Sequence, residues 1–290
     1  MRVVRHTDVA TFARLAVPLL GAAEAENNLP LGICDGLSWQ DPASPLPYLA
    51  TVDDVGGPVT VALMTPPRKL VLSAAPREAL EALCVDLIGH GTPVPGAIGR
   101  ADVAETFAAI WERHTGETTS VEHALRIYQL VSVTPPAPIA GRLRRASDVD
   151  LRLVQQWAHA FMVEAGLADE LAGITGIVER AVRTERLYLW DDAGPVAMAA
   201  WTGPTPNGVR ITLVYTPPPL RGRGYASACV AALSASLLAS GRKFCFLFTD
   251  LANPTSNSIY QRLGYRPVCD VREYRFERRP ATSAYQLLHS

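Results

Sequence analysis

The chain has 290 residues, of which 48% are hydrophobic, and its formal net charge at pH 7 is −1. This length and apolar content predict a globular protein with a sizeable core, built as one large domain or two of ordinary size. The absence of an overall basic excess argues against nucleic acid as a partner.

Cysteines and histidines are few and dispersed. None of the five cysteines forms a CxxC pair, and the six histidines show no metal-ligand spacing, so we expect no metal. Scattered cysteines are typical of reduced core thiols, and the segment MRVVRHTDVATF lacks the pattern of a signal peptide. We therefore expect a cytoplasmic protein.

The chain repeats itself in the same order. Three pairs of segments resemble each other: residues 2–12 and 142–152, residues 48–73 and 187–214, and residues 108–116 and 257–265. The middle pair carries Asp/Gly turns between short apolar runs, which predict hairpins. Prolines in TPPAPIAG (134–141) favour an extended linker. We predict two similar domains, residues 1–136 and residues 137–290.

The second half reads as strands alternating with helices. Helices are expected at Val149–Ala165, Ile174–Thr184, Tyr225–Ala239 and around Thr255–Leu263, and strands near Leu143 and at Leu187–Trp190, Val196–Thr202, Val209–Tyr215, Lys243–Thr249 and Val268–Phe276. This order predicts a mixed sheet with helices on both faces, an α/β (α+β) arrangement.

The stretch PPPLRGRGYASACVAALSASLLASG (217–241) admits three interpretations. It is uncharged from Gly224 to Gly241, which is the length of a short membrane span. Its serines and alanines make it only mildly hydrophobic, so a buried soluble helix is the better prediction and no membrane partner is expected. A basic turn before an alanine-rich core helix, without any ligand, is the third interpretation.

The glycine loop of this stretch also fits an anion site, because the N–H groups of the loop and of the first helical turn have no partners. A Walker GxxxxGK[ST] loop is absent, and Ser227 replaces the third glycine of a dinucleotide GxGxxG fingerprint. What fits is R-x-x-G-x-A at Arg221, Gly224 and Ala226, followed downstream by NPTSNSIYQRLGY. Together these motifs resemble the GCN5-related N-acetyltransferase (GNAT) family over residues 142–277.

The resemblance implies two tandem GNAT-like domains, each a mixed, mostly antiparallel sheet flanked by helices, with acetyl-CoA as co-substrate of the second. In this family the pantetheine arm of acetyl-CoA pairs with a splayed strand and its pyrophosphate lies on the following loop. Prolines 217–219 would end that pairing because they carry no N–H. The cofactor residues so implied include Val214, Tyr215, Thr216, Arg221, Gly222, Arg223, Gly224, Tyr225, Ala226 and Ser227.

The downstream segment supplies the remaining site residues. By resemblance, Asn253 and Asn257 contact CoA, and Tyr260 donates a proton to the leaving thiolate as a general acid. The alternative for Tyr260 is a packed core tyrosine with a satisfied hydroxyl. Four carboxylates are candidates for a general base, and water is a further one: Glu164, Glu179, Glu185 and Asp250.

The first domain lacks the corresponding features. Its segment SAAPREALEALCVDLIG (73–89) has no glycine pair, and Glu78 and Glu81 would repel a pyrophosphate. Trp111 stands opposite Tyr260 and cannot protonate a sulfur in the same way. We expect a degenerate domain that walls the substrate cleft or stabilises its neighbour. Trp39 is a candidate for lining such a cleft or for an ordinary packing role.

The main prediction is an acetyl-CoA-dependent N-acetyltransferase whose acceptor is a small-molecule amine or a peptide amine. Transfer of another acyl group is a related alternative. A non-catalytic acyl-CoA-binding or regulatory module is the alternative from another functional class. Transfer from aminoacyl-tRNA would require a basic surface, which the net charge of −1 does not indicate.

Overall fold

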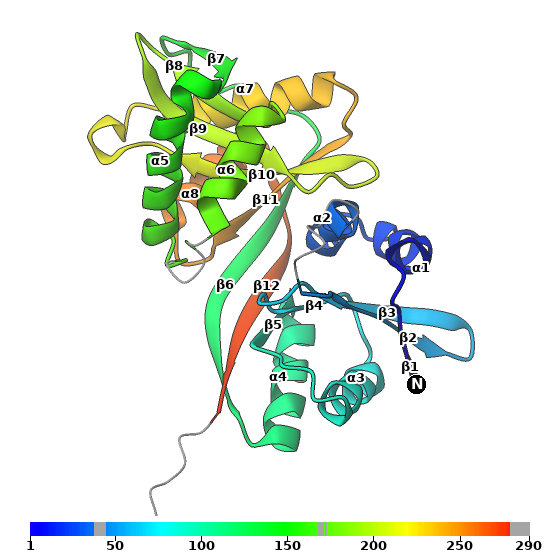
Figure 1. Cartoon of the computed structure of the whole chain (residues 1–290). Helices are drawn as coiled ribbons and strands as arrows, with labels where there is room; N and C mark the ends of the chain where they lie inside the picture. The colour runs from blue at the N-terminus through cyan, green and yellow to red at the C-terminus, as the bar shows by residue number, and fades with distance from the viewer. Residues whose placement is uncertain (38–44, 168–170, 172, 279–290) are drawn as a thin grey trace, which may run out of the picture. The chain divides into compact units, whose positions relative to one another are not determined.

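The computed structural model describes residues 1–37, 45–167, 171 and 173–278, and its chain forms two compact units (Figure 1). The first unit consists of residues Met1–Ala23, Leu37–Leu125 and Asp270–Ser290. The second consists of Glu24–Gly36 and Arg126–Cys269. Each unit therefore contains a segment from the other half of the chain, an exchange that the sequence-based division at residue 136 does not include.

The first unit is a mixed sheet with three helices. Its strands follow the order β1-β2-β3-β4-β5-β12-β6, and only the β4–β5 pairing is parallel among the registers of its described strands. The strands are β1 (Arg2–Arg5), β2 (Tyr48–Asp54), β3 (Gly57–Met64), β4 (Leu70–Leu72), β5 (Gly96–Arg100) and parts of β6 (Thr118–Leu130) and β12 (Arg266–Glu277). The helices are α1 (Val9–Gly21), α3 (Arg77–Gly89) and α4 (Ala101–Thr115).

The second unit repeats this order, and its parallel pair is longer: β10 has 8 residues where β4 has 3, and β11 has 7 where β5 has 5. Its sheet runs β6-β11-β10-β9-β8-β7, with β10 and β11 parallel. The strands are β7 (Arg142–Arg145), β8 (Leu187–Asp191), β9 (Pro195–Thr202), β10 (Gly208–Tyr215) and β11 (Phe244–Asp250). The helices are α2 (Asn28–Leu37), α5 (Leu151–Glu164), α6 (Ile174–Arg183), α7 (Tyr225–Ala239) and α8 (Pro254–Arg262), with short 3₁₀ turns η1 (Asp148–Asp150) and η3 (Pro218–Leu220).

Two apolar cores cover the two faces of the second sheet. Strand residues Val209 and Ile211 pack with α7, while Met198 and Leu213 pack with α5 and α6. Helix α7 presents apolar residues around most of its surface, and seven of its side chains are buried. This explains the small-residue composition, because a helix that lies close to a sheet requires short side chains.

The fold class predicted from the sequence is confirmed. The predicted helix at 225–239 is α7 to the residue, and the other predicted helices and strands of the second half lie within a few residues of the observed ones. The repeated segments occupy matching elements, since residues 2–5 and 142–145 form the first strand of each unit. No helix in the described part of the chain combines the length and apolar character needed to cross a bilayer.

Candidate acyl-CoA site

Strands β10 and β11 separate part of the way along their length. Their parallel pairing consists of Gly208, Val209 and Arg210 with residues 244–246, whereas β10 continues to Tyr215 and β11 to Asp250. The pairing register therefore ends at Arg210, and the following residues of β10 have no register partner on β11. Their backbone N–H and C=O groups form a free edge between two strands, which an extended ligand can pair with.

An irregularity in β10 coincides with this separation. The register between β10 and β9 shifts between Thr212 and Tyr215, and Leu213 has a φ of +50°. A positive φ is unfavourable for leucine, at a cost of about 1–2 kcal/mol. The bulge changes the face of the sheet on which the odd-numbered side chains of β10 lie. Val209 and Ile211 belong to the α7 core, whereas Leu213 and Tyr215 belong to the α5–α6 core. The bulge thereby turns the end of β10 away from its neighbour.

The loop after β10 exposes backbone N–H groups toward solvent. Residues 221–224 are exposed, and both glycines are left-handed, with φ values of +76° for Gly222 and +83° for Gly224. Gly224 is the N-cap of α7, and no side chain caps the helix there. The first-turn amides of Tyr225, Ala226 and Ser227 thus lack intrahelical acceptors at the positive end of the helix dipole.

Arg221 is already engaged by a carboxylate. Its Nη2 donates to Glu164 Oε2 at 2.6 Å, its Nε donates to the Thr216 carbonyl at 2.9 Å, and it lies over the Tyr215 ring. The Tyr215 hydroxyl also donates to Glu164 at 3.4 Å, and burial together with Glu164 raises the pKa of Tyr215. Glu164, a candidate base from the sequence, therefore lies at the mouth of the loop as the partner of Arg221.

Tyr225 and Arg223 complete the loop. The Tyr225 hydroxyl donates to Asp192 Oδ2 at 2.8 Å, and this bond raises the pKa of Tyr225. Arg223 is exposed and lies beside Tyr225. Its guanidinium can therefore reach an anion that sits on the loop amides.

The two predicted asparagines have different roles in the structure. Asn253 caps α8, where its Oδ1 accepts from Ser256 N at 3.0 Å. Asn257 Nδ2 donates to the carbonyls of Asp250 (2.8 Å) and Asn253 (2.7 Å), and its Oδ1 accepts from the Tyr128 hydroxyl at 2.9 Å. Both amide hydrogens of Asn257 are thus used within the protein, so only its Oδ1 retains capacity for a further bond.

Tyr260 lies on α8 against the same core as α7. Its side chain is 9% exposed and meets Tyr265 edge to face at 5.8 Å between ring centroids. Burial raises the pKa of Tyr260 to about 12. The phenol is therefore protonated at neutral pH, which is the state that a proton donor requires.

The other candidate bases occupy ordinary surface positions. Glu185 accepts from Arg145 at 2.7 Å, and Glu179 accepts a bond from the Gln155 amide. Asp250 lies at the end of β11, on the separated side. Of the four carboxylates, Glu164 and Asp250 are therefore the ones that lie at the ends of elements bordering the opening.

These features fit the acyl-CoA ligand that the sequence motifs predicted. The Thr216 hydroxyl is buried and has no hydrogen-bond partner among the described residues, directly after the free edge of β10. Val214, Tyr215 and Thr216 would pair with the amide-bearing arm, and the amides of residues 222–227 would hold the pyrophosphate. The carrier would supply an activated acyl thioester at this edge.

Two further residues of this region could not be identified from the sequence. Tyr128, on β6, reaches Asn257 from 129 positions away in the chain. Arg210 donates to Asn28 Oδ1 at 3.2 Å, although 182 positions separate the two residues. Only the tertiary fold brings these pairs together, and no local motif marks them.

The corresponding part of the first unit is closed. Strands β4 and β5 pair at Leu70 and Val71, and a Cβ added at Gly99 would lie 3.0 Å from the Leu72 carbonyl, so the strands remain adjacent to the end of β4. Helix α3 begins after Pro76 without a side-chain cap and carries Glu78 in its first turn. Here the structure describes neither a glycine loop nor a free strand edge.

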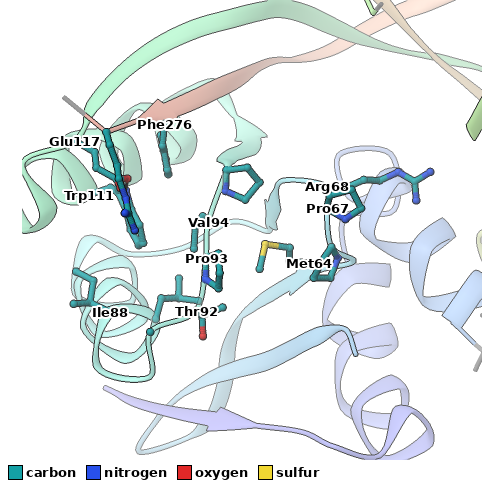
Figure 2. Close-up of a pocket in the computed structure, with 15 residues that line it drawn as sticks. Met64, Pro67, Arg68, Ile88, Thr92, Pro93, Val94, Trp111, Glu117 and Phe276 are labelled. Carbon is teal, nitrogen blue, oxygen red and sulfur yellow. Dashed lines mark hydrogen bonds and ion pairs between the residues drawn. The ribbon is translucent and has the colours of Figure 1, made fainter. Parts of the chain in front are cut away.

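A half-open cavity of about 630 Å³ lies elsewhere in the first unit (Figure 2). Figure 2 shows Met64 and Pro67 on one side of it and Trp111 and Phe276 on the other. Trp111 stacks on Phe276 and donates from Nε1 to Glu117 Oε2 at 2.8 Å. The indole N–H is therefore satisfied internally, and Trp111 acts as a packing residue of this unit.

Among the described residues no group of three or more His, Cys, Asp or Glu side chains is placed to hold a metal ion. Four of the five cysteines are buried, and burial raises the pKa of Cys229 to about 12. Trp39 falls outside the residues that the structure describes.

Comparisons with known proteins agree with this geometry. Residues 189–275 match the family model "FR47-like protein", and none of the curated protein sequences matches the chain. A GNAT-family acetyltransferase from Colwellia psychrerythraea superposes with a TM-score of 0.60 at 14% identity, covering 96% of this chain and 100% of that one.

Two further structures cover almost the whole chain. A GCN5-related N-acetyltransferase from Sphaerobacter thermophilus gives a TM-score of 0.63 at 16% identity over 96% of each chain. A tandem GNAT protein from the clavulanic acid biosynthesis pathway gives 0.57 at 14% identity, covering 97% of this chain and 99% of that one. The GNAT resemblance of the sequence is thereby confirmed: the chain has the tandem fold of the GCN5-related N-acetyltransferases, and most of the FR47-like match lies in its second unit.

Proposed function

We propose that the second unit transfers an acetyl group from acetyl-CoA to a primary amine. The observation that carries this proposal is the separation of β10 from β11 after Arg210. The exposed loop with Gly222 and Gly224 follows the end of β10. A free strand edge and an uncapped helix start, in this order, match the two parts of an acyl-CoA molecule, an amide-bearing arm and a pyrophosphate.

The chain's own groups account for the steps of the reaction. The nitrogen of a neutral amine attacks the thioester carbonyl carbon, a C–N bond forms and the C–S bond breaks. Backbone N–H groups near Tyr215 polarise the carbonyl oxygen. Tyr260 gives its phenolic proton to the departing thiolate and regains one from solvent, while the amine nitrogen loses its surplus proton to water.

The first unit has a different role in this proposal. Its closed β4–β5 pair and the acidic start of α3 leave no place for a pyrophosphate. We assign the cofactor site to the second unit, which holds most of the predicted domain of residues 137–290, and a supporting role to the first unit, which holds most of the predicted domain of residues 1–136. The chain as a whole is then a tandem protein with one acyl-CoA site.

The test is a screen of small amines, amino acids and peptides with acetyl-CoA, in which release of free thiol is followed. The proposal predicts thiol release that depends on the amine and an acetylated product in the mass spectrum. Binding of acetyl-CoA without any acetylated amine would instead support an acyl-CoA-binding regulatory module.

A further inference from the structure

Arg210 is a largely buried cation that forms no ion pair with any of the residues that the structure describes. Its Nη1 donates to Asn28 Oδ1 at 3.2 Å and its Cζ lies 5.7 Å from the Phe248 ring centroid. Burial lowers the pKa of Arg210 to about 10, so the guanidinium remains charged at neutral pH. No carboxylate oxygen of the described residues forms an ion pair with it, although a guanidinium offers five N–H donors.

Neighbouring groups hold α2 in place without neutralising this charge. Asn28 is fully buried, and its Nδ2 donates to the Ala25 carbonyl at 2.7 Å. The carboxylate of Glu24 accepts from the backbone N–H of Asn207 at 2.8 Å and from its side-chain amide at 2.7 Å. Glu24 therefore anchors the segment before α2 to the β9–β10 turn, and it does not pair with Arg210.

The close approach of α2 keeps the space beside Arg210 narrow. A Cβ added at Gly32 would lie 2.6 Å from the Gly203 Cα, and one added at Gly203 would lie 3.3 Å from Arg210 Nη2. Arg210 nonetheless keeps part of its surface exposed. Leaving a largely buried guanidinium unpaired is costly, so a carboxylate that bound Arg210 would offset the cost of its desolvation.

The position of Arg210 connects it with the acyl site. Arg210 is the last residue of β10 that pairs with β11, so it marks the closed end of the opening. An arm that enters from the loop at residues 222–227 and runs along β10 brings its acyl carbonyl to the N–H groups near Tyr215, so an acceptor would lie between the acyl group and this closed end. Because strand side chains alternate, Arg210 lies on the face opposite Val209 and Ile211, away from the face that α7 covers.

Resting on the proposed function, we propose that Arg210 binds a carboxylate of the acceptor, so that the substrate is a small amine that also carries a carboxylate group. Two parallel N–H donors of a guanidinium match the two oxygens of a carboxylate, which fixes the orientation of the amine as well as its charge. Phe248 supports the plane of the guanidinium from one side. Arg210 is a specificity-determining residue in this proposal.

The experiment compares matched acceptors on the full chain. The common α-amino acids, β-alanine and 4-aminobutyrate are each assayed beside their carboxamides with acetyl-CoA, using wild type, Arg210→Met and Arg210→Lys. Wild type is expected to prefer at least one free acid to its amide. Arg210→Met should lower kcat/KM for that acid by about 10- to 100-fold and leave the amide nearly unchanged. Arg210→Lys keeps the positive charge but lacks the two parallel N–H donors, so its kcat/KM for the acid should lie between those of wild type and Arg210→Met.

Controls separate recognition from folding. Arg186→Met removes another arginine of the same unit that lies over an aromatic ring, that of Trp201, and should leave the preference intact. Acetyl-CoA binding and the melting temperature are measured for each variant, and both should stay close to wild type for Arg210→Lys. If Arg210→Met and Arg210→Lys acetylate amines with the same ratio of kcat/KM for acid to kcat/KM for carboxamide as wild type, this inference alone is overturned. Acetyl-CoA binding without acetylation of any amine would overturn the proposed function and this inference with it.

Discussion

Arg221 and Glu164 form an ion pair at the mouth of the glycine loop, with 2.6 Å between Nη2 and Oε2. Both side chains are nearly half exposed, so the pair itself contributes little to stability. An anion on the loop amides would compete with Glu164 for the same guanidinium. The pair therefore connects the loop to the end of α5 in the absence of an anion.

This relationship predicts opposite effects of two substitutions on acetyl-CoA affinity. Arg221→Ala should weaken binding by about 10-fold because a charge-assisted phosphate contact is lost. Glu164→Gln should strengthen binding by a few fold, because Arg221 is released from its competitor. Titration calorimetry measures both, with the exposed Arg152→Ala as the control. Equal affinity of Arg221→Ala and wild type would remove Arg221 from the site.

The left-handed glycines allow a backbone prediction. A Cβ at Gly224 would meet only Ile139, at 3.7 Å, but the φ of +83° is strained for alanine. Gly224→Ala should therefore cost about 1 kcal/mol of unfolding free energy and reorient the loop, with a clear loss of acetyl-CoA affinity. Gly173→Ala is the matched control, since φ is −99° there and its Cβ meets nothing within 4 Å. Denaturant unfolding and calorimetry distinguish the two variants, and identical behaviour would contradict the loop assignment.

Tyr260→Phe tests the proton donor. Removing the hydroxyl should lower kcat by about 100-fold while acetyl-CoA still binds, because the phenol acts on the leaving thiolate. With a pKa of about 12, the donor should not limit the wild-type rate between pH 7 and about 10. Stopped-flow or steady-state thiol release against pH provides the measurement. A Tyr260→Phe variant with the wild-type kcat would identify Tyr260 as a packing residue.

Local sequence motifs were enough to predict many residues of the candidate site. Pro217–Gly224 and Asn253–Tyr260 each carry their pattern within eight residues, and helix α7 ends at Ala239, two residues before the left-handed Gly241. The bulge at Leu213 was not readable, because leucine is a poor residue for positive φ and tertiary packing imposes it there. The hydrogen bonds between Arg210 and Asn28 and between Tyr128 and Asn257 each join residues more than a hundred positions apart in the sequence.

The exchange of segments between units was also beyond local reasoning. Residues 271–275 of β12 pair with β5 in the first unit, and Glu24–Gly36 belongs to the second. Strand periodicity predicts that residues 268–276 form a strand, but it does not specify the neighbouring strand. Pairing partners are set by the packing of whole sheets.

The Arg144 network predicts the acid sensitivity of the second unit. Arg144 donates two bonds to Asp150, at 2.7 and 2.8 Å, and these bonds lower the pKa of Asp150 from 3.8 to about 2. A third bond from Arg144 goes to Asp191 and lowers the pKa of that carboxyl. The unfolded state holds its proton more tightly, so the stabilisation is complete above pH 3.8 and is lost as pH falls through about 2. Asp150→Asn should lower the free energy of unfolding by about 3 kcal/mol at pH 7.

The control for this network is Asp148→Asn, an exposed acid two positions earlier. It should unfold like wild type in urea at pH 7 and show the same loss of stability at low pH. Asp150→Asn should instead show a flatter pH dependence below pH 4. Parallel curves for Asp150→Asn and wild type would contradict the role of the Arg144–Asp150 pair.

The central claim is that acyl-CoA lies along the free edge of β10 and on the loop that follows. Hydrogen exchange of backbone amides, with and without acetyl-CoA, tests it most directly because the proposed contacts are made by N–H groups. The account predicts slower exchange at residues 213–216 and 222–227, with no change at residues 73–80 at the start of α3. Protection confined to the first unit, or its absence from both parts of the β10 region at saturating acetyl-CoA, would contradict it.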